Sequence, residues 1–210
     1  CVYILEQIVG FDPRDNSSTD RPFSFRADPG SMRGRRLGVH RREFLLSQSD
    51  HNRQVFQTAL DVWESMGVII EDIDLPTYPT GALFTTIVTV ESGTIFEPLF
   101  ADGRAGGMFS FNEDRAAGWM AGRMMPASDY LTAQRIRSQL TREADDILSR
   151  YDAVIAPTWP NGAGMREVSD GWPIPARHEW EPPEDFDVST PRLNYIANLV
   201  SHPGLNIPCG

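Results

Sequence analysis

The most regular alternation of hydrophobic and polar positions in the chain runs from residue 128 to residue 151. Apolar residues recur there at steps of three and four, which places them on one face of a helix. These apolar residues are Ala133, Ile136, Leu140, Ala144, Ile147 and Tyr151. The charged residues left for solvent are Arg135, Arg137, Arg142 and Glu143. The spacing predicts an amphipathic helix with Ser128 as its N-cap and Pro126 just outside.

The hydrophobic period changes after Asp152, where we expect the helix to end. Residues 153–156 form a short unbroken apolar run that Pro157 stops. Such a run predicts a buried strand of a parallel sheet. A Pro-Thr-Trp-Pro turn, residues 157–160, then stands at the carboxyl end of the strand. That end is where an α/β protein places a ligand.

A strand–helix–strand unit is predicted earlier in the chain. Residues 37–40 form a short strand, and residues 68–75, VIIEDIDL, alternate as a second strand. The helix between them begins at Ser49 or Asp50 and ends at Gly67. Its apolar face comprises Val55, Phe56, Ala59, Leu60, Trp63 and Met66. This order predicts a right-handed crossover between parallel strands. A nucleotide site is disfavoured because no glycine-rich loop follows the first strand.

Another helix is predicted over residues 80–100, where a helical spacing persists despite many β-branched residues. Its stripe consists of Phe84, Val88, Glu91, Ile95 and Leu99. We expect this helix to be buried on most sides. Glu91 would then need a partner, because a buried carboxylate without one is costly. An ion pair with an Arg is favoured over a catalytic role.

Two interpretations of residues 101–127 stay open. The segment is rich in glycine and methionine, and it contains Trp119, Phe109 and Phe111. An adaptable backbone with Met side chains suits the lining or cover of a hydrophobic substrate channel. The alternative is an irregular, partly buried connection between two helices.

Toward the carboxyl end the chain loses its period before one last short helix. Residues 161–190 predict a solvated, proline-rich loop. His178 stands there among carboxylates, without the softer ligands at defined spacing that zinc requires. Residues 193–200 predict a helix, and residues 205–207 resemble a strand. His202, beside a turn proline, is interpreted as structural.

The totals describe a globular protein and exclude some partners. The 210 residues, 40% of them hydrophobic, suffice for a domain with a real core. No apolar run approaches the roughly 18 residues of a membrane helix. The net charge of −10 argues against a nucleic-acid surface, which needs clustered cations. Cys1 and Cys209, at opposite ends, do not make a disulfide framework. The default location is the cytoplasm.

The basic residues restrict the chemistry. All 19 of them are Arg, and the chain contains no Lys. A guanidinium stays charged at any working pH and cannot serve as an unprotonated amine base. Ser17 and Ser18 lie in a connection, residues 11–34, without a glycine-rich setting or an activating base. They are interpreted as loop serines, and a lysine-dependent mechanism cannot be completed by this chain alone.

Several segments together resemble the second half of an amidase signature enzyme. They are DYLTAQRIRSQL, YDAVIAPTWP and ANLVSHPGLNIPCG, with FDPRDNSSTDRP and the stretch from MRGRRLGVH to EDIDLP in the expected order. The resemblance implies an α/β fold with a mixed, mostly parallel sheet flanked by helices. It also implies carboxamide hydrolysis by a Ser-Ser-Lys set, in which backbone amides stabilise the oxyanion.

Some functional residues of the family have a counterpart in this chain, and others do not. The glycine- and serine-rich nucleophile loop and the Lys have no counterpart here, so no catalytic residue is assigned, and neither a metal nor a cofactor is expected. Thr158 and Trp159 match the family's Pro-Thr-x-Pro turn and are the substrate-lining candidates. Asn198 matches an Asn in a backbone-supporting role. Ser201 replaces a usual Gly, and Gly204 a usual Ala.

The expected organisation is one partial domain over residues 1–210, truncated at both ends. Within it lie a strand–helix–strand unit (34–75), helices with a central strand (80–160), and a loop with a final helix and strand (161–210). Cys1 is interpreted as an interior residue of a longer polypeptide, with residues 2–9 as a helix tail. The expected partners are a small amide substrate and the missing amino-terminal part of the enzyme, without nucleic acid or membrane. A homodimer is compatible with the sequence.

Two alternatives to an amidase fragment stay open. The A subunit of a tRNA-dependent amidotransferase belongs to the same family, and its pocket needs an Arg and an Asp for glutamine. Arg104, Arg115 and Arg123 are available, but the residues before the last helix, Pro191, Arg192 and Leu193, include no acid. A non-catalytic scaffold or binding module is the second alternative, suggested by the missing Lys and serine loop.

Overall fold

The computed structural model describes residues 2–24, 30–46, 50–104, 113–158, 167–169, 172–174 and 191–209. The chain divides into two units, Cys1–Arg33 and Gly34–Gly210.

The first unit consists of helix α1 (Val2–Ile8) and a loop held by its own polar side chains. The helix predicted over residues 2–9 is therefore present. Ser18 accepts the Asp12 amide at 2.9 Å, and Ser17 donates its hydroxyl to Asp15 at 2.6 Å. The two serines hold turns of this loop, as the sequence predicts.

The second unit contains a parallel sheet of β1 (Arg36–Val39), β2 (Ile69–Asp72) and β3 (Ala153–Ile155). Their order is β2-β1-β3, with Leu37 opposite Ile70 on one side and Ala153 on the other. The parallel pairing and the strand after residue 152 are thus confirmed, but β3 is not buried as predicted: Ala153 is exposed and Val154 and Ile155 are half-buried, because among the described residues β3 pairs only with β1. The α/β prediction is confirmed with them.

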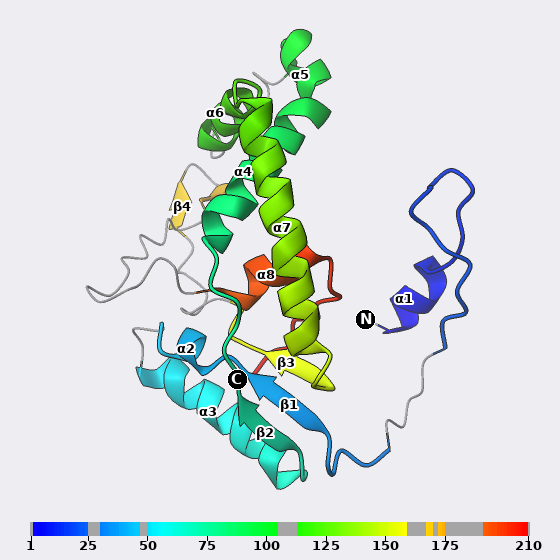
Figure 1. Cartoon of the computed structure of the whole chain (residues 1–210), viewed down its shortest axis with the longest axis vertical. Coiled ribbons are helices and arrows are strands. Elements are labelled where there is room, and N and C mark those ends of the chain that lie inside the picture. Colours follow the sequence, from blue (N-terminus) through cyan, green and yellow to red (C-terminus); the bar gives the residue numbers. More distant parts are fainter. Residues whose placement is uncertain are drawn as a thin grey trace. The chain divides into compact units, whose positions relative to one another are not determined.

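One side of the strand–helix–strand unit is formed by α2 (Arg41–Phe44) and α3 (Asp50–Ser65). Figure 1 shows α3 alongside β2, apart from the group formed by α4, α7 and α8. Leu60 is the buried residue of α3, and Gly67 ends the turn after it with φ of 85°. Only glycine adopts that φ without strain, so the predicted stop is confirmed.

The main hydrophobic core lies among α4 (Thr80–Ile95), α7 (Ala127–Leu148) and α8 (Leu193–Val200). The predicted stripe of α7 faces this core. Its most enclosed members are Ala133, Leu140 and Ala144. Leu83 and Ile87 enter from α4, and Ile196 and Leu199 from α8. Burial of these side chains holds the helices together, at roughly 25 cal/mol per Å² of apolar surface.

The remaining elements are α5 (Glu97–Ala101), α6 (Glu113–Gly122), β4 (Glu167–Ser169) and β5 (Trp172–Ile174). β4 and β5 form an antiparallel pair. α6 packs against α4, with the Trp119 ring stacked on Phe96 at 4.5 Å. Glycines stand at this crossing on both helices, Gly93 on α4 and Gly122 on α6.

The ends of α7 differ from the prediction. Pro126, and not Ser128, occupies the N-cap position, and no side chain caps the helix. Ser128 lies inside the first turn, where its hydroxyl donates to Asp129 at 3.3 Å. The helix ends at Leu148, before the predicted end at Asp152, whose carboxylate accepts the Arg36 amide at 2.9 Å and pairs with Arg35.

Two charged residues of α7 that were predicted to face solvent instead form hydrogen bonds to other parts of the protein. Arg137 is half-buried and donates from Nε to the Leu199 carbonyl near the end of α8. Glu143 is half-buried and accepts the Tyr78 hydroxyl at 2.7 Å. Packing of α8 and of the segment before α4 against α7 supplies these partners, which periodicity alone does not reveal.

The prediction that α4 is buried on most sides is wrong. Its buried face carries Leu83 and Ile87, one position before the predicted Phe84 and Val88, and Ile95 is 70% exposed. Glu91 is exposed, and it accepts hydrogen bonds from Tyr130 at 2.8 Å and Gln134 at 3.4 Å. The prediction that Glu91 pairs with an Arg is therefore wrong. Glu91 lies outside the buried face of α4, and its partners are polar side chains of α7.

Two predicted strands are shorter or missing. β2 spans four residues, opposite the four residues of β1. Beyond it Ile73 and Leu75 are buried outside the strand, and the Ile73 amide still donates to the Val39 carbonyl at 2.9 Å. Residues 205–207 are exposed and form no strand. Within the part of the chain that the structure describes, no helix is both long and apolar enough to span a bilayer.

Ser201 adopts the left-handed conformation, with φ of 59°, directly after α8. Glycine takes this conformation without the steric penalty of a Cβ atom. We expect Ser201→Gly to raise the free energy of unfolding by about 1 kcal/mol, measured by urea denaturation. Ser201→Ala keeps the Cβ and loses only the hydroxyl that accepts from Arg137 at 3.3 Å, so it should give no gain. Equal stability of the Gly and Ala variants would contradict the prediction.

Candidate functional site

The carboxyl ends of the three strands meet at one edge of the sheet, because all three run parallel. His40 follows β1, Ile73 follows β2, and residues 156–158 follow β3. The segment after β2 continues to Pro79, where α4 begins. The structure therefore brings the carboxyl end of β3, which was predicted for ligand contact, to the same side as the carboxyl ends of β1 and β2.

Thr158, the first predicted substrate residue, is exposed beyond β3. Its hydroxyl donates to the Asn206 side-chain oxygen at 3.0 Å, which ties the strand end to the final segment. Trp159, the second, lies outside the described residues. Asn198 donates to the Asn194 carbonyl one turn earlier in α8, at 2.7 Å. Thr158 and Trp159 stay predictions as substrate contacts.

A buried polar cluster joins the end of β1 to the start of α8. His40 is 1% exposed, and its ring nitrogens face the carbonyls of Ile73 at 3.2 Å and Pro191 at 3.1 Å. Glu43 is 2% exposed, and it accepts the Leu193 amide at 3.0 Å. These contacts position the amino-terminal turn of α8 against the sheet.

Burial controls the protonation of Glu43. It raises the pKa of the carboxyl group to about 7, although the Leu193 amide and the Arg192 guanidinium, 3.6 Å away, favour the charged form. Arg192 also lies over the Tyr195 ring at 5.3 Å, and Tyr195 contacts Phe84 of α4 at 5.3 Å between ring centroids. The cluster thus connects the sheet edge to α4 through α8.

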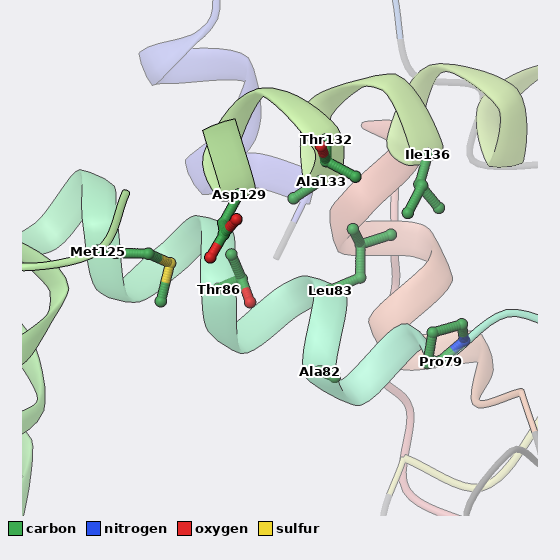
Figure 2. Close-up of a pocket in the computed structure, with 9 residues that line it drawn as sticks. All are labelled: Pro79, Ala82, Leu83, Thr86, Met125, Asp129, Thr132, Ala133 and Ile136. Atoms are coloured by element: carbon green, nitrogen blue, oxygen red, sulfur yellow. The ribbon is translucent and has the colours of Figure 1, made fainter. Parts of the chain in front are cut away.

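A hollow of about 320 Å³ lies between α4 and α7. Figure 2 shows α4 and α7 forming its two walls, with Met125 at one end and Pro79 at the other. It is lined by Pro79, Ala82, Leu83, Thr86, Met125, Asp129, Thr132, Ala133 and Ile136. Its volume falls at the lower end of the range of small-molecule sites, and most of its lining is apolar.

A second hollow of about 190 Å³ lies among α4, α7 and α8. It is lined by Phe84, Ile87, Val88, Glu91, Arg137, Asn198 and Leu199. Its charged groups already have partners, since Arg137 donates to Leu199 and Glu91 accepts from Tyr130. The Glu91 carboxylate raises the pKa of the Tyr130 hydroxyl. This hollow is smaller, and its polar groups serve the packing of the three helices.

Comparison with known proteins identifies the family. A family model described as Amidase matches residues 1–210. The chain belongs to the amidase family, the amidase signature enzymes. An amidase of Pseudomonas putida is 26% identical over 99% of this chain and 43% of its own length. The A subunit of the glutamyl-tRNA(Gln) amidotransferase of Roseiflexus sp. (strain RS-1) is 29% identical over 100% of this chain and 45% of its own length. The chain spans less than half the length of these curated relatives.

Solved amidase structures share the fold. A bacterial aryl acylamidase of the amidase signature family superposes with a TM-score of 0.63 and 19% identity, over 90% of this chain and 40% of that one. A crystal structure of an amidase gives a TM-score of 0.59 and 20% identity, over 80% of this chain and 36% of that one. At these identities the likeness establishes the fold of this amidase-family chain and not its substrate.

The basic residues considered for a glutamine pocket are engaged elsewhere or lie outside the described side chains. Arg104 pairs with Asp102 at 2.7 Å, and Arg123 pairs with Glu97. The side chain of Arg115 lies outside those described. Within the described ranges no group of three or more His, Cys, Asp or Glu could hold a metal, and His178 lies outside them.

His202 Nε2 lies 2.6 Å from Asp145 Oδ1, within hydrogen-bonding distance. This partner fits the structural interpretation of His202, because it fixes the segment after α8 to α7. Sequence patterns missed the His40–Glu43 cluster. The available signal was two ionisable residues directly after the carboxyl end of a parallel strand, where polar side chains gather.

Proposed function

We propose that this chain forms the substrate-pocket part of an amidase-signature hydrolase that cleaves a carboxamide C–N bond. The nucleophilic Ser and the Lys base would belong to sequence outside these 210 residues, since this sequence has no Lys and no glycine-rich serine loop. The missing amino-terminal part of the enzyme is its main proposed partner. Family membership supports the reaction class.

The observation that carries the proposal is the apolar hollow between α4 and α7 (Figure 2). It begins at Pro79, on the segment that leaves the carboxyl end of β2. Its apolar lining suits the hydrocarbon part of an amide, and Thr86 adds a hydroxyl group to the lining. We infer that the hollow binds the apolar portion of the substrate.

Acetanilide tests the hollow directly. We expect it to shift the NMR methyl signals of Met125 and Ala133 in the purified chain. Ala82 is exposed and lines the hollow, so Ala82→Trp should fill it and abolish the shifts. Ala117→Trp, at an exposed position on α6, is the matched control and should leave them unchanged. Shifts that survive Ala82→Trp, or no shifts at all, would overturn the assignment.

The purified chain should not hydrolyse acetanilide, because it lacks the proposed catalytic groups. Turnover that a serine-directed phosphonate abolishes would contradict the location of the nucleophile. Similarity to amidotransferase A subunits supports a second candidate, in which glutamine is the amide. Displacement of acetanilide from the hollow by glutamine, at comparable concentration, would favour that candidate. Acetanilide binding without such competition favours the hydrolase of an apolar amide.

A further inference from the structure

The hollow between α4 and α7 has one formally charged lining residue, Asp129. Six of the nine lining residues are apolar: Pro79, Ala82, Leu83, Met125, Ala133 and Ile136. The other two, Thr86 and Thr132, carry hydroxyl groups. A carboxylate among apolar side chains distinguishes ligands by charge as well as by shape.

Figure 2 shows the Asp129 side chain reaching from the first turn of α7 toward α4, between Met125 and Thr86. Its hydrogen-bond donor is the Ser128 hydroxyl at 3.3 Å, a long contact. Across the described part of the chain, no ion pair involves this carboxylate, so its oxygens keep accepting capacity toward the hollow. The helix start favours a negative charge here but, at about half a unit charge, does not neutralise it.

The other carboxylate beside a hollow behaves differently. Glu91 accepts hydrogen bonds from the Tyr130 hydroxyl and from the Gln134 amide, which occupy it within the protein. The hydroxyl of Thr132 donates to the Ser128 carbonyl at 2.8 Å, and its oxygen can still accept a hydrogen bond. Asp129 thus presents acceptor oxygens on the α7 wall of the larger hollow, whereas the Thr132 hydroxyl proton is used within α7.

We propose that this hollow selects amides whose apolar body carries a protonated amine, with Asp129 as the residue that recognises the ammonium group. This inference rests on the proposed function and specifies its substrate class. An ammonium group brings N–H donors that match the Asp129 carboxylate in a charge-assisted contact. The apolar body then lies against Leu83, Ala133 and Ile136.

Two probes of nearly equal shape isolate the charge. Phenylalaninamide carries an aromatic ring, a carboxamide and an amine that is protonated at about pH 6, whereas 3-phenylpropanamide lacks the amine. NMR titration of the 210-residue chain should show phenylalaninamide binding about threefold to fivefold more tightly, as for a solvent-exposed ion pair. Added salt should reduce that preference, because the charge pair is screened.

Variants assign the preference to one carboxylate. Asp129→Asn should make the two affinities equal. Asp146→Asn, at an exposed position of α7 that does not line the hollow, should keep the preference. Equal binding of both probes to the unmodified chain would overturn the charge selectivity and leave the hollow as a pocket. If neither probe nor acetanilide binds, the proposed pocket fails and the selectivity fails with it.

Discussion

Replacing Gly122 with Ala is expected to lower the free energy of unfolding by about 2 kcal/mol, although Ala is the better helix former. A Cβ atom at Gly122 would lie 2.7 Å from the Thr89 carbonyl carbon and closer still to its oxygen. The obstacle is backbone of α4, which cannot move aside as a flexible side chain would. Overpacking then exceeds the gain in helix propensity.

Gly118 supplies the matched control on the same helix. Among the described residues, no atom outside α6 lies within 4 Å of a Cβ built there, so Gly118→Ala should stabilise the chain by up to about 1 kcal/mol. Urea denaturation followed by circular dichroism measures both variants. Stabilisation by both substitutions would show that α4 and α6 do not approach each other this closely in solution.

The second large effect is a pH dependence of stability that originates at Glu43. Its pKa of about 7 in the folded chain lies above its ordinary value of 4.5, so the folded state holds this proton more tightly than the unfolded state. The contribution to stability is complete below about pH 4.5 and is lost as the pH rises through about 7. The expected loss is about 3 kcal/mol across that window.

Glu43→Gln keeps the shape of the side chain and cannot ionise. The difference in unfolding free energy between this variant and the unmodified chain should change by about 3 kcal/mol between about pH 4.5 and pH 8. The difference should favour the variant increasingly at higher pH. The other ionisable groups titrate equally in both proteins and cancel in this comparison.

Glu71→Gln is the control of opposite sign. Arg36 lowers the pKa of Glu71, so that carboxylate contributes stability at higher pH and loses it as the pH falls. A Glu43→Gln variant whose stability difference stays constant over the window would contradict the buried, raised-pKa state of Glu43. Hydrogen exchange at the Leu193 amide, which Glu43 binds, would locate the change at the start of α8.

Periodicity predicted the elements whose burial follows from sequence alone. The stripe of α7 repeats over more than four turns, so errors at single positions do not change its assignment. The run at residues 153–155 predicts a strand because it is short, unbroken and apolar, and the structure pairs it with β1 while leaving it only partly covered. The helix α4 was predicted, but its buried face was not. Its apolar and polar residues are only weakly separated around the helix, so their pattern does not say which face is buried.

The candidate site was predictable only in outline. The resemblance placed Thr158 at a strand end and assigned no catalytic residue, and the structure puts that strand at the edge of a parallel sheet. The resemblance did not indicate the hollow between α4 and α7, whose walls are separated by about forty residues of sequence. Nor did it indicate that Glu43 binds the Leu193 amide, a contact across 150 positions.

The amino-acid sequence by itself determined the alternating helices and strands, the family resemblance and the absence of a lysine base, since each depends on residue identity and short-range spacing. Tertiary structure decided which face of α4 is covered, that Gly93 and Gly122 each lie against the opposite helix where α4 and α6 cross, and that the Glu43 carboxyl group is buried away from water. The physical reason is the same in each case. Solvation and close packing depend on neighbours that are distant in sequence, and only the folded chain brings those neighbours together.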